Sequence, residues 1–203
     1  MINLTFLVKS DRMNETVSSP VINKTGYSHV AIAFHWIMAI LIVVNWTLAI
    51  VIDDMPLGPD RITGYSWHKW LGITVLFLVS LRLMWRATHP APKLEIAMPL
   101  WQERAMQLTH IALYFLMFAV PLMGWMMSSA EGYTVNYFGL FELPNLVDKN
   151  KELGDQLGDL HGFLAYALSG FVGIHVLAAL KHQFIDKDNL LGRMSFSSRL
   201  KKD

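Results

Sequence analysis

Four long apolar stretches, separated by polar segments that contain proline, dominate the pattern of the chain. A helix of about 20 residues crosses the hydrocarbon core of a bilayer, and each stretch has about this length. The pattern therefore predicts an all-α fold, an integral membrane four-helix bundle. The predicted spans are Val30 to Ile52, Trp67 to Trp85, Leu108 to Ser128 and Leu160 to Leu180.

The polar segments between these spans are expected to be connections, because proline and charged residues interrupt the apolar pattern. They are Asp53 to Ser66, Arg86 to Gln107 and Glu131 to Asp159. Residues 1–26 form an expected N-terminal extension, residues 27–194 the membrane domain, and residues 195–203 a basic C-terminal tail.

Composition agrees with a membrane protein and narrows its chemistry. The chain is 53% hydrophobic and 16% charged, and its formal net charge of +1 gives no reason to expect a nucleic-acid partner. There is no cysteine, which excludes disulfides, iron–sulfur clusters and covalently attached haem. A redox centre must therefore be bound by other side chains, and the eight histidines are the obvious supply.

The distribution of Lys and Arg predicts the orientation, since an excess of these residues marks the cytoplasmic side. Thirteen lie in the first tail, in the second connection with its helix ends, and in the last tail, whereas four lie on the opposite side. Both termini are therefore expected in the cytoplasm. The second and fourth spans would then run inward from the outer face.

Five histidines lie within the predicted spans, where an ionisable side chain is costly and usually marks a functional site. His68 and His161 both lie near the outer ends of their spans, and His35 and His175 both lie near the inner ends. Two pairs at two depths suit two haems, each bound by two histidines. His110, near the inner end of the third span, is the fifth.

The spacing of His161 and His175 on the fourth span tests this hypothesis. They are 14 residues apart, which places them within roughly 40° of one helix face and about 21 Å apart along the axis. One helix can therefore supply a ligand to each of two stacked haems.

His110 complicates the assignment, because its depth would also let it replace His35 or His175 as a ligand. We favour a different role for His110, as a proton-exchanging neighbour of a quinone. Haem propionates also need positive counter-charges near the membrane surface. Lys69 is placed for the outer haem, and Arg82 and Arg86 for the inner one.

Taken together, these motifs resemble the bacterial cytochrome b561 family, over Tyr27 to Met194. The segments that carry the resemblance are Phe34-His35-Trp36, Trp67-His68-Lys69 with Gly72, Arg82 to Arg86, His110 with Pro121 and Gly124, Leu160-His161-Gly162, and His175 to His182 with Ile185 to Asp188. The resemblance implies two non-covalent b haems, with His35 and His175 holding the inner one and His68 and His161 the outer one. It also implies a bacterial inner membrane, exchange with ubiquinone and, in one branch, oxidation of superoxide.

Three functions compete at this point. The first is an electron-transfer protein or oxidoreductase that connects a quinone pool with an unidentified outer-face partner, for which superoxide is a candidate. The alternative is a membrane cytochrome b subunit that anchors a larger dehydrogenase or hydrogenase. A histidine-lined metal transporter is disfavoured, because none of the four spans contains Asp or Glu.

Overall fold

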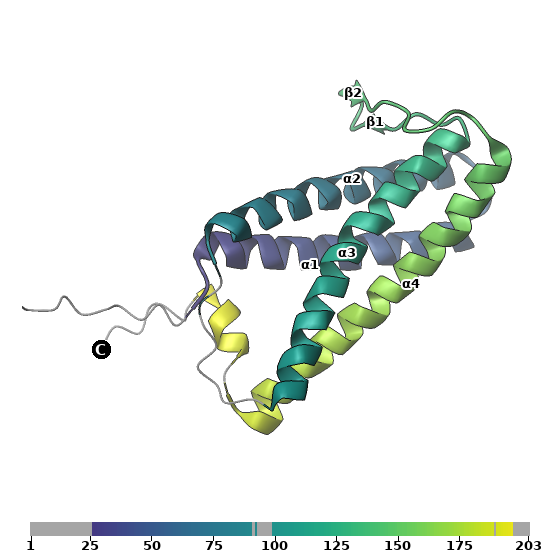
Figure 1. The fold of residues 1–203 in the computed structure, drawn as a ribbon. Helices are drawn as coiled ribbons and strands as arrows, with labels where there is room; N and C mark the ends of the chain where they lie inside the picture. Colours follow the sequence, from purple (N-terminus) through teal and green to yellow (C-terminus); the bar gives the residue numbers. More distant parts are fainter. Residues whose placement is uncertain (1–25, 91, 93–98, 189, 197–203) are drawn as a thin grey trace, which may run out of the picture.

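Four long helices make up most of the computed structural model, which describes residues 26–90, 92, 99–188 and 190–196. They are α1 (His29–Asp54), α2 (Pro59–Thr88), α3 (Leu100–Ala130) and α4 (Lys151–Lys181). α1 packs on α2, α3 packs on α4, and α2 joins the two pairs through its contact with α3 (Figure 1). The predicted all-α four-helix bundle is confirmed. Most of the expected N-terminal extension and of the basic tail lies outside the described residues.

The helices extend beyond the predicted spans, so the three predicted connections are wrong at their edges. Pro59 occupies the first turn of α2, where its missing N–H costs nothing. Ser28 caps α1 by accepting a hydrogen bond from the Ala31 amide, and Asn150 caps α4 at the Leu153 amide. Hydropathy locates the lipid boundary, whereas caps and backbone hydrogen bonds decide where a helix begins and ends.

All four helices are long and apolar enough to cross a membrane, and an 18-residue window in each has a mean hydropathy between 1.4 and 2.2. Large apolar side chains also cover the outside of the bundle: Ile40, Phe115 and Phe163 are each at least 60% exposed. A soluble monomer rarely exposes so much apolar surface. Lipid is therefore the natural environment of these outer faces, and the chain is a multi-pass membrane protein.

The buried core lies in the middle of the bundle and receives side chains from all four helices. Leu168 of α4 belongs to this core and lies seven residues from both His161 and His175. The core thus separates the two histidine levels. Its buried members are Met38, Val79, Leu113, Leu116, Met117 and Leu168.

One end of the bundle, which we call the hairpin end, is covered by the segment between α3 and α4 (Figure 1). This segment contains the antiparallel strands β1 (Asn136–Tyr137) and β2 (Phe141–Glu142). The indole N–H of Trp70 donates to the carbonyl of Asn136, and the hydroxyls of Thr74 and Tyr137 are 2.9 Å apart. These contacts fasten the hairpin to α2.

The opposite end, which we call the terminal end, brings the N-terminal part of α1 next to the C-terminal segment. After α4, the chain turns through η1 (His182–Asp186) and η2 (Leu191–Met194). The carbonyl of Met194 then accepts a hydrogen bond of 3.0 Å from the indole of Trp36. The described parts that lead to the two termini therefore lie at the same end of the bundle.

The close approach of α1 and α2 gives a stability prediction at Gly64, which is buried. A Cβ at Gly64 would lie 2.8 Å from Cγ1 of Ile52, itself only 1% exposed and unable to move away. Gly64→Val should therefore lower the free energy of unfolding by about 1 to 3 kcal/mol. Gly170→Val is the matched control, because a Cβ there meets nothing within 4 Å. Detergent-induced unfolding compares the two, and equal stability would refute the predicted clash.

Candidate functional site

At the hairpin end, α2 and α4 bring His68 and His161 together. Their ring centroids are 6.1 Å apart, and the ring planes are inclined by 84°. Nδ1 of His161 lies 2.9 Å from the carbonyl oxygen of Val120. A carbonyl oxygen only accepts hydrogen bonds, so Nδ1 carries the proton and donates it. Nε2 of the neutral ring then keeps its lone pair. The buried Nδ1 of His68 has no hydrogen bond of good geometry among the described residues, although the Asn45 backbone interacts with this ring.

A glycine on α3 lets the backbone approach the His161 ring. A Cβ at Gly124 would lie 3.0 Å from Cε1 and 3.1 Å from Nδ1 of His161. The ring is therefore held from the α3 side by the Val120 carbonyl and by close packing. On α4 itself, a Cβ at the adjacent Gly162 would meet nothing within 4 Å. Open space thus remains beside Gly162, the residue that follows this histidine.

At the terminal end, α1 and α4 bring His35 and His175 together with the same ring spacing, 6.1 Å, at an inclination of 68°. Both terminal nitrogens of Arg82 lie 3.3 Å from Nδ1 of His35. A guanidinium only donates hydrogen bonds, so His35 accepts at Nδ1 in this arrangement. The two predicted pairs of histidines are thus adjacent in the fold, while metal ligation itself stays a prediction.

His110 of α3 is also next to His175, with ring centroids 5.3 Å apart. Its Nδ1 lies 2.7 Å from the carbonyl of Met106 and donates to it. Nε2 is then the nitrogen that keeps a lone pair. The structure therefore places three histidines at the terminal end and two at the hairpin end.

Two arginines lie beside the terminal-end histidines. Arg82 donates from Nε to the hydroxyl of Tyr114 at 3.1 Å, and the guanidinium carbons of Arg82 and Arg86 lie 5.8 and 5.9 Å from the Tyr114 ring centre. In the described part of the chain, neither arginine forms an ion pair with a carboxylate. This cluster therefore offers positive charge to an anionic group.

Lys69 is the cation at the hairpin end. Its Nζ donates to the hydroxyl of Ser128 at 2.8 Å and lies 5.5 Å from the centre of the Tyr133 ring. Both partners are neutral. Lys69 thus brings positive charge to the end of the bundle that holds His68 and His161.

The ring spacings can be compared with what a metal between two imidazoles requires. Two metal–nitrogen bonds of about 2 Å, with about 1 Å from each nitrogen to its ring centre, give a spacing of about 6 Å when the two rings lie on opposite sides of the metal. His35 with His175, and His68 with His161, both match this value at 6.1 Å. The spacing of His110 and His175, 5.3 Å, is too short for this opposed arrangement. Two imidazoles at this spacing, with cations nearby, fit a haem with propionates at each end.

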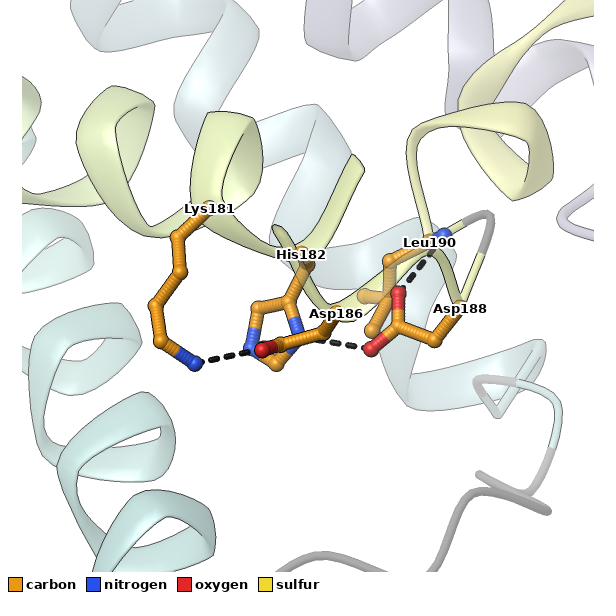
Figure 2. Close-up of polar contacts among 5 residues, drawn as sticks. All are labelled: Lys181, His182, Asp186, Asp188 and Leu190. Carbon is orange, nitrogen blue, oxygen red and sulfur yellow. Dashed lines mark hydrogen bonds and ion pairs between the residues drawn. The ribbon is translucent and has the colours of Figure 1, made fainter. Parts of the chain in front are cut away.

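A further polar cluster follows α4 at the terminal end (Figure 2). Nδ1 of His182 lies 2.6 Å from a carboxylate oxygen of Asp188 and 3.2 Å from one of Asp186, while Lys181 forms an ion pair with Asp186. The Leu190 amide donates to the other oxygen of Asp188. These groups satisfy one another and fasten the turn that returns the chain toward α1.

Sequence reasoning missed the neighbours that orient the predicted site residues. Tyr114 lies four residues after His110, a spacing that puts both on one side of α3 and could have indicated it. Ser128, Tyr133 and the Val120 carbonyl gave no such signal, because their contacts join segments that are far apart in the sequence. They became visible only in the fold.

Comparison with known proteins agrees with this geometry. The family model for prokaryotic cytochrome b561 matches residues 26–197. Cytochrome b561 homologue 2 of Escherichia coli (strain K12) is 31% identical over 173 residues, which cover 83% of this chain and 90% of the relative. A probable superoxide oxidase, CybB, of Yersinia pestis is 29% identical over 175 residues, 83% of this chain and 94% of that protein.

The relatives and the fold agree on a class of protein. Both match over almost their whole length, and the structure has four helices able to cross a membrane. A b-type haem is the cofactor of such a cytochrome, and electron transfer in the membrane is its general activity. The chain therefore belongs to the prokaryotic cytochrome b561 family.

Proposed function

We propose that this protein transfers electrons across a bacterial inner membrane, between ubiquinone and a redox partner at the outer face, with two b haems. The observation that supports this proposal most strongly is the repeated spacing of 6.1 Å in two histidine pairs at opposite ends of the bundle. α4 contributes one member to each pair. One helix therefore carries a histidine of each site.

The terminal end is proposed to face the cytoplasm, and the hairpin end the outside. This follows from the 13 to 4 division of Lys and Arg, although several of the 13 lie outside the described residues. His35 and His175 then form the inner site, and His68 and His161 the outer site.

Each site would hold its haem through Nε2 of two histidines, with cations for the propionates. Haem with two histidine ligands supplies reversible one-electron transfer. Val120 orients His161 for this role, as a carbonyl partner of a metal-bound histidine does. At the inner site, Arg82 would release Nδ1 of His35 and turn, together with Arg86, toward a propionate of the haem. At the outer site, Lys69 supplies the positive charge.

The quinone is proposed to meet the protein beside His110. This ring is next to His175 yet too close to it for the two to bind a metal from opposite sides, and its Nδ1 donates to the Met106 carbonyl. Nε2 of His110 is then available to exchange a proton with the oxygen of a quinone head. Arg82 lies nearby and can orient the same head group.

Superoxide is the outer partner that the name of the Yersinia pestis relative suggests. In the balanced reaction, two superoxide ions each lose one electron and become dioxygen. Ubiquinone gains both electrons and two protons and becomes ubiquinol. The protons would come from the inner side, where His110 lies.

The orientation predicts which fusions of a periplasmic reporter are active. Alkaline phosphatase fused after Asp203 should be inactive, because the terminal end faces the reducing cytoplasm. The same enzyme inserted at the Leu140 turn should be active. The opposite pattern would exchange the inner and outer sites.

The pairing predicts which histidine substitutions affect the same cofactor. His35→Ala and His175→Ala should each lower the haem content from two per chain to one, and the remaining spectrum should be the same. His68→Ala and His161→Ala should each remove the other haem. His89→Ala is the control, because that ring stacks on Trp85 at the end of α2 and should leave both. Loss of a haem in His110→Ala, with both kept in His35→Ala, would overturn the inner assignment.

The proposed places of the two substrates predict a separation of activities in His68→Ala. Ubiquinol should still reduce the haem that remains, because His110, Arg82 and His175 are intact. Reduction by superoxide should be lost, since about 21 Å of helix separates the two levels on α4. Stopped-flow absorbance with each reductant measures both rates. Loss of reduction by ubiquinol would move the quinone to the outer site.

A further inference from the structure

The hairpin, residues 136–142, exposes large apolar side chains although it lies outside the four predicted spans. Leu140 is 77% exposed and Phe141 is 55% exposed. The only charged residue of the hairpin is Glu142. Adjacent exposed apolar side chains of this size mark a contact with a membrane or with another protein. The hairpin therefore needs an apolar partner.

The contacts of the hairpin place it beside a part of α2 that belongs to a predicted membrane span. The Trp70 indole donates to the Asn136 carbonyl, and the Tyr137 hydroxyl is 2.9 Å from that of Thr74. Thr74 lies seven residues after Trp67, where the second predicted span begins, which corresponds to about 10 Å of helix. Figure 1 shows the hairpin extending from the end of α3 back over α2. The hairpin thus lies near the level at which α2 enters the apolar layer.

The side of α2 that holds the hairpin also faces lipid. Phe77 follows Thr74 by three residues, so both lie on one side of the helix, and Phe77 is 62% exposed. Tyr137 and Phe141 are paired across the two strands, with ring centres 5.5 Å apart, and share one face of the hairpin. That face reaches Thr74 through the Tyr137 hydroxyl. Phe141 therefore extends the apolar surface that Phe77 presents to lipid.

The turn of the hairpin separates a side chain that packs on α2 from one that stays exposed. Its central residues, Phe138 and Gly139, have φ of 50° and 72°, and the Leu140 amide donates to the Tyr137 carbonyl. Phenylalanine rarely adopts a positive φ. Here this conformation accompanies the stacking of the Phe138 ring on Trp70 at 4.6 Å, while Leu140 remains exposed. Tryptophan is enriched where a membrane meets water, so an aromatic group typical of that boundary holds the turn.

We infer that the hairpin is an interfacial lipid anchor, with Leu140 and Phe141 inserted at the boundary between headgroups and acyl chains. Insertion removes their apolar surface from water, which is favourable, and apolar side chains on a segment that does not span the membrane bind at this boundary. Lipid is the occupant that the structure favours, because the lipid-facing surface of α2 continues onto the hairpin. The anchor keeps the hairpin beside the level of His68 and His161. It does not depend on the proposed electron transfer.

A spin label on the hairpin tests this contact directly. Since the chain contains no cysteine, Leu140→Cys creates a single attachment point for a nitroxide. The full-length, haem-loaded protein is placed in nanodiscs of phosphatidylcholine and phosphatidylglycerol, with one copy per disc. Asp148→Cys is the matched control, an exposed residue of the same connection between α3 and α4. Phe115→Cys, on the exposed apolar surface of α3, gives the lipid reference.

Electron paramagnetic resonance then measures how often each label collides with oxygen, which partitions into lipid, and with a nickel chelate that stays in water. The ratio of oxygen to nickel collisions at Leu140→Cys should be several-fold higher than at Asp148→Cys and approach the ratio at Phe115→Cys. Equal ratios at Leu140→Cys and Asp148→Cys would overturn the inference. So would a label at residue 140 that neither reagent reaches, because protein would then cover it. Dipolar broadening between labels at residue 140 in densely loaded vesicles would identify a second copy of the chain as the occupant instead.

A substitution without a label tests the same contact through hydrogen exchange. The Leu140 amide donates to Tyr137 and the Leu143 amide to Val135, so both amides report on whether the hairpin is closed. Leu140→Asp should raise their exchange rates several-fold in the nanodiscs, because a carboxylate is costly to place in the apolar layer. Asn145→Asp adds the same charge at an exposed position of the same connection and should leave both rates unchanged. Unchanged exchange in Leu140→Asp would contradict the anchor.

Discussion

The cost of placing imidazole rings inside an apolar bundle is the constraint on which this structure depends. A buried polar nitrogen must have a partner, and in a membrane water cannot supply one. His161 and His110 each satisfy one nitrogen with a backbone carbonyl of α3. In each ring, Nε2 is the nitrogen left for another partner. The fold thus places imidazole rings at two levels with Nε2 directed away from the backbone carbonyls, and a metal at each level would use such nitrogens.

The two levels differ in charge and in surroundings. The terminal end holds three histidines and two arginines around Tyr114, a setting suited to anionic groups and to proton exchange. The hairpin end holds two histidines and one lysine beneath a hairpin fixed by aromatic contacts. This asymmetry is what a protein needs if it exchanges electrons with different partners at its two faces.

Much of this arrangement could be predicted from the sequence, because apolar stretches, charge bias and helical periodicity are local properties. The spacing of His161 and His175 predicted that both lie on one face of a helix. Their depths in the membrane predicted the partners that the fold shows, His68 for His161 and His35 for His175. Helix ends were less predictable from hydropathy. The Asn150 cap begins α4 within a polar segment, where the apolar pattern gives no signal. The contact of Arg82 with His35, and the nearness of His110 to His175, depend on rotamers and helix rotation. These follow from packing between segments distant in the chain.

The claim at the centre of this account is that one chain holds two haems, each between two histidines. The most direct test is to quantify haem against protein in the purified sample and to record its electron paramagnetic resonance in the oxidised form. The account predicts two b haems per chain, with two low-spin signals of six-coordinate iron. A single haem per chain, or a high-spin signal from iron that lacks one histidine, would contradict it.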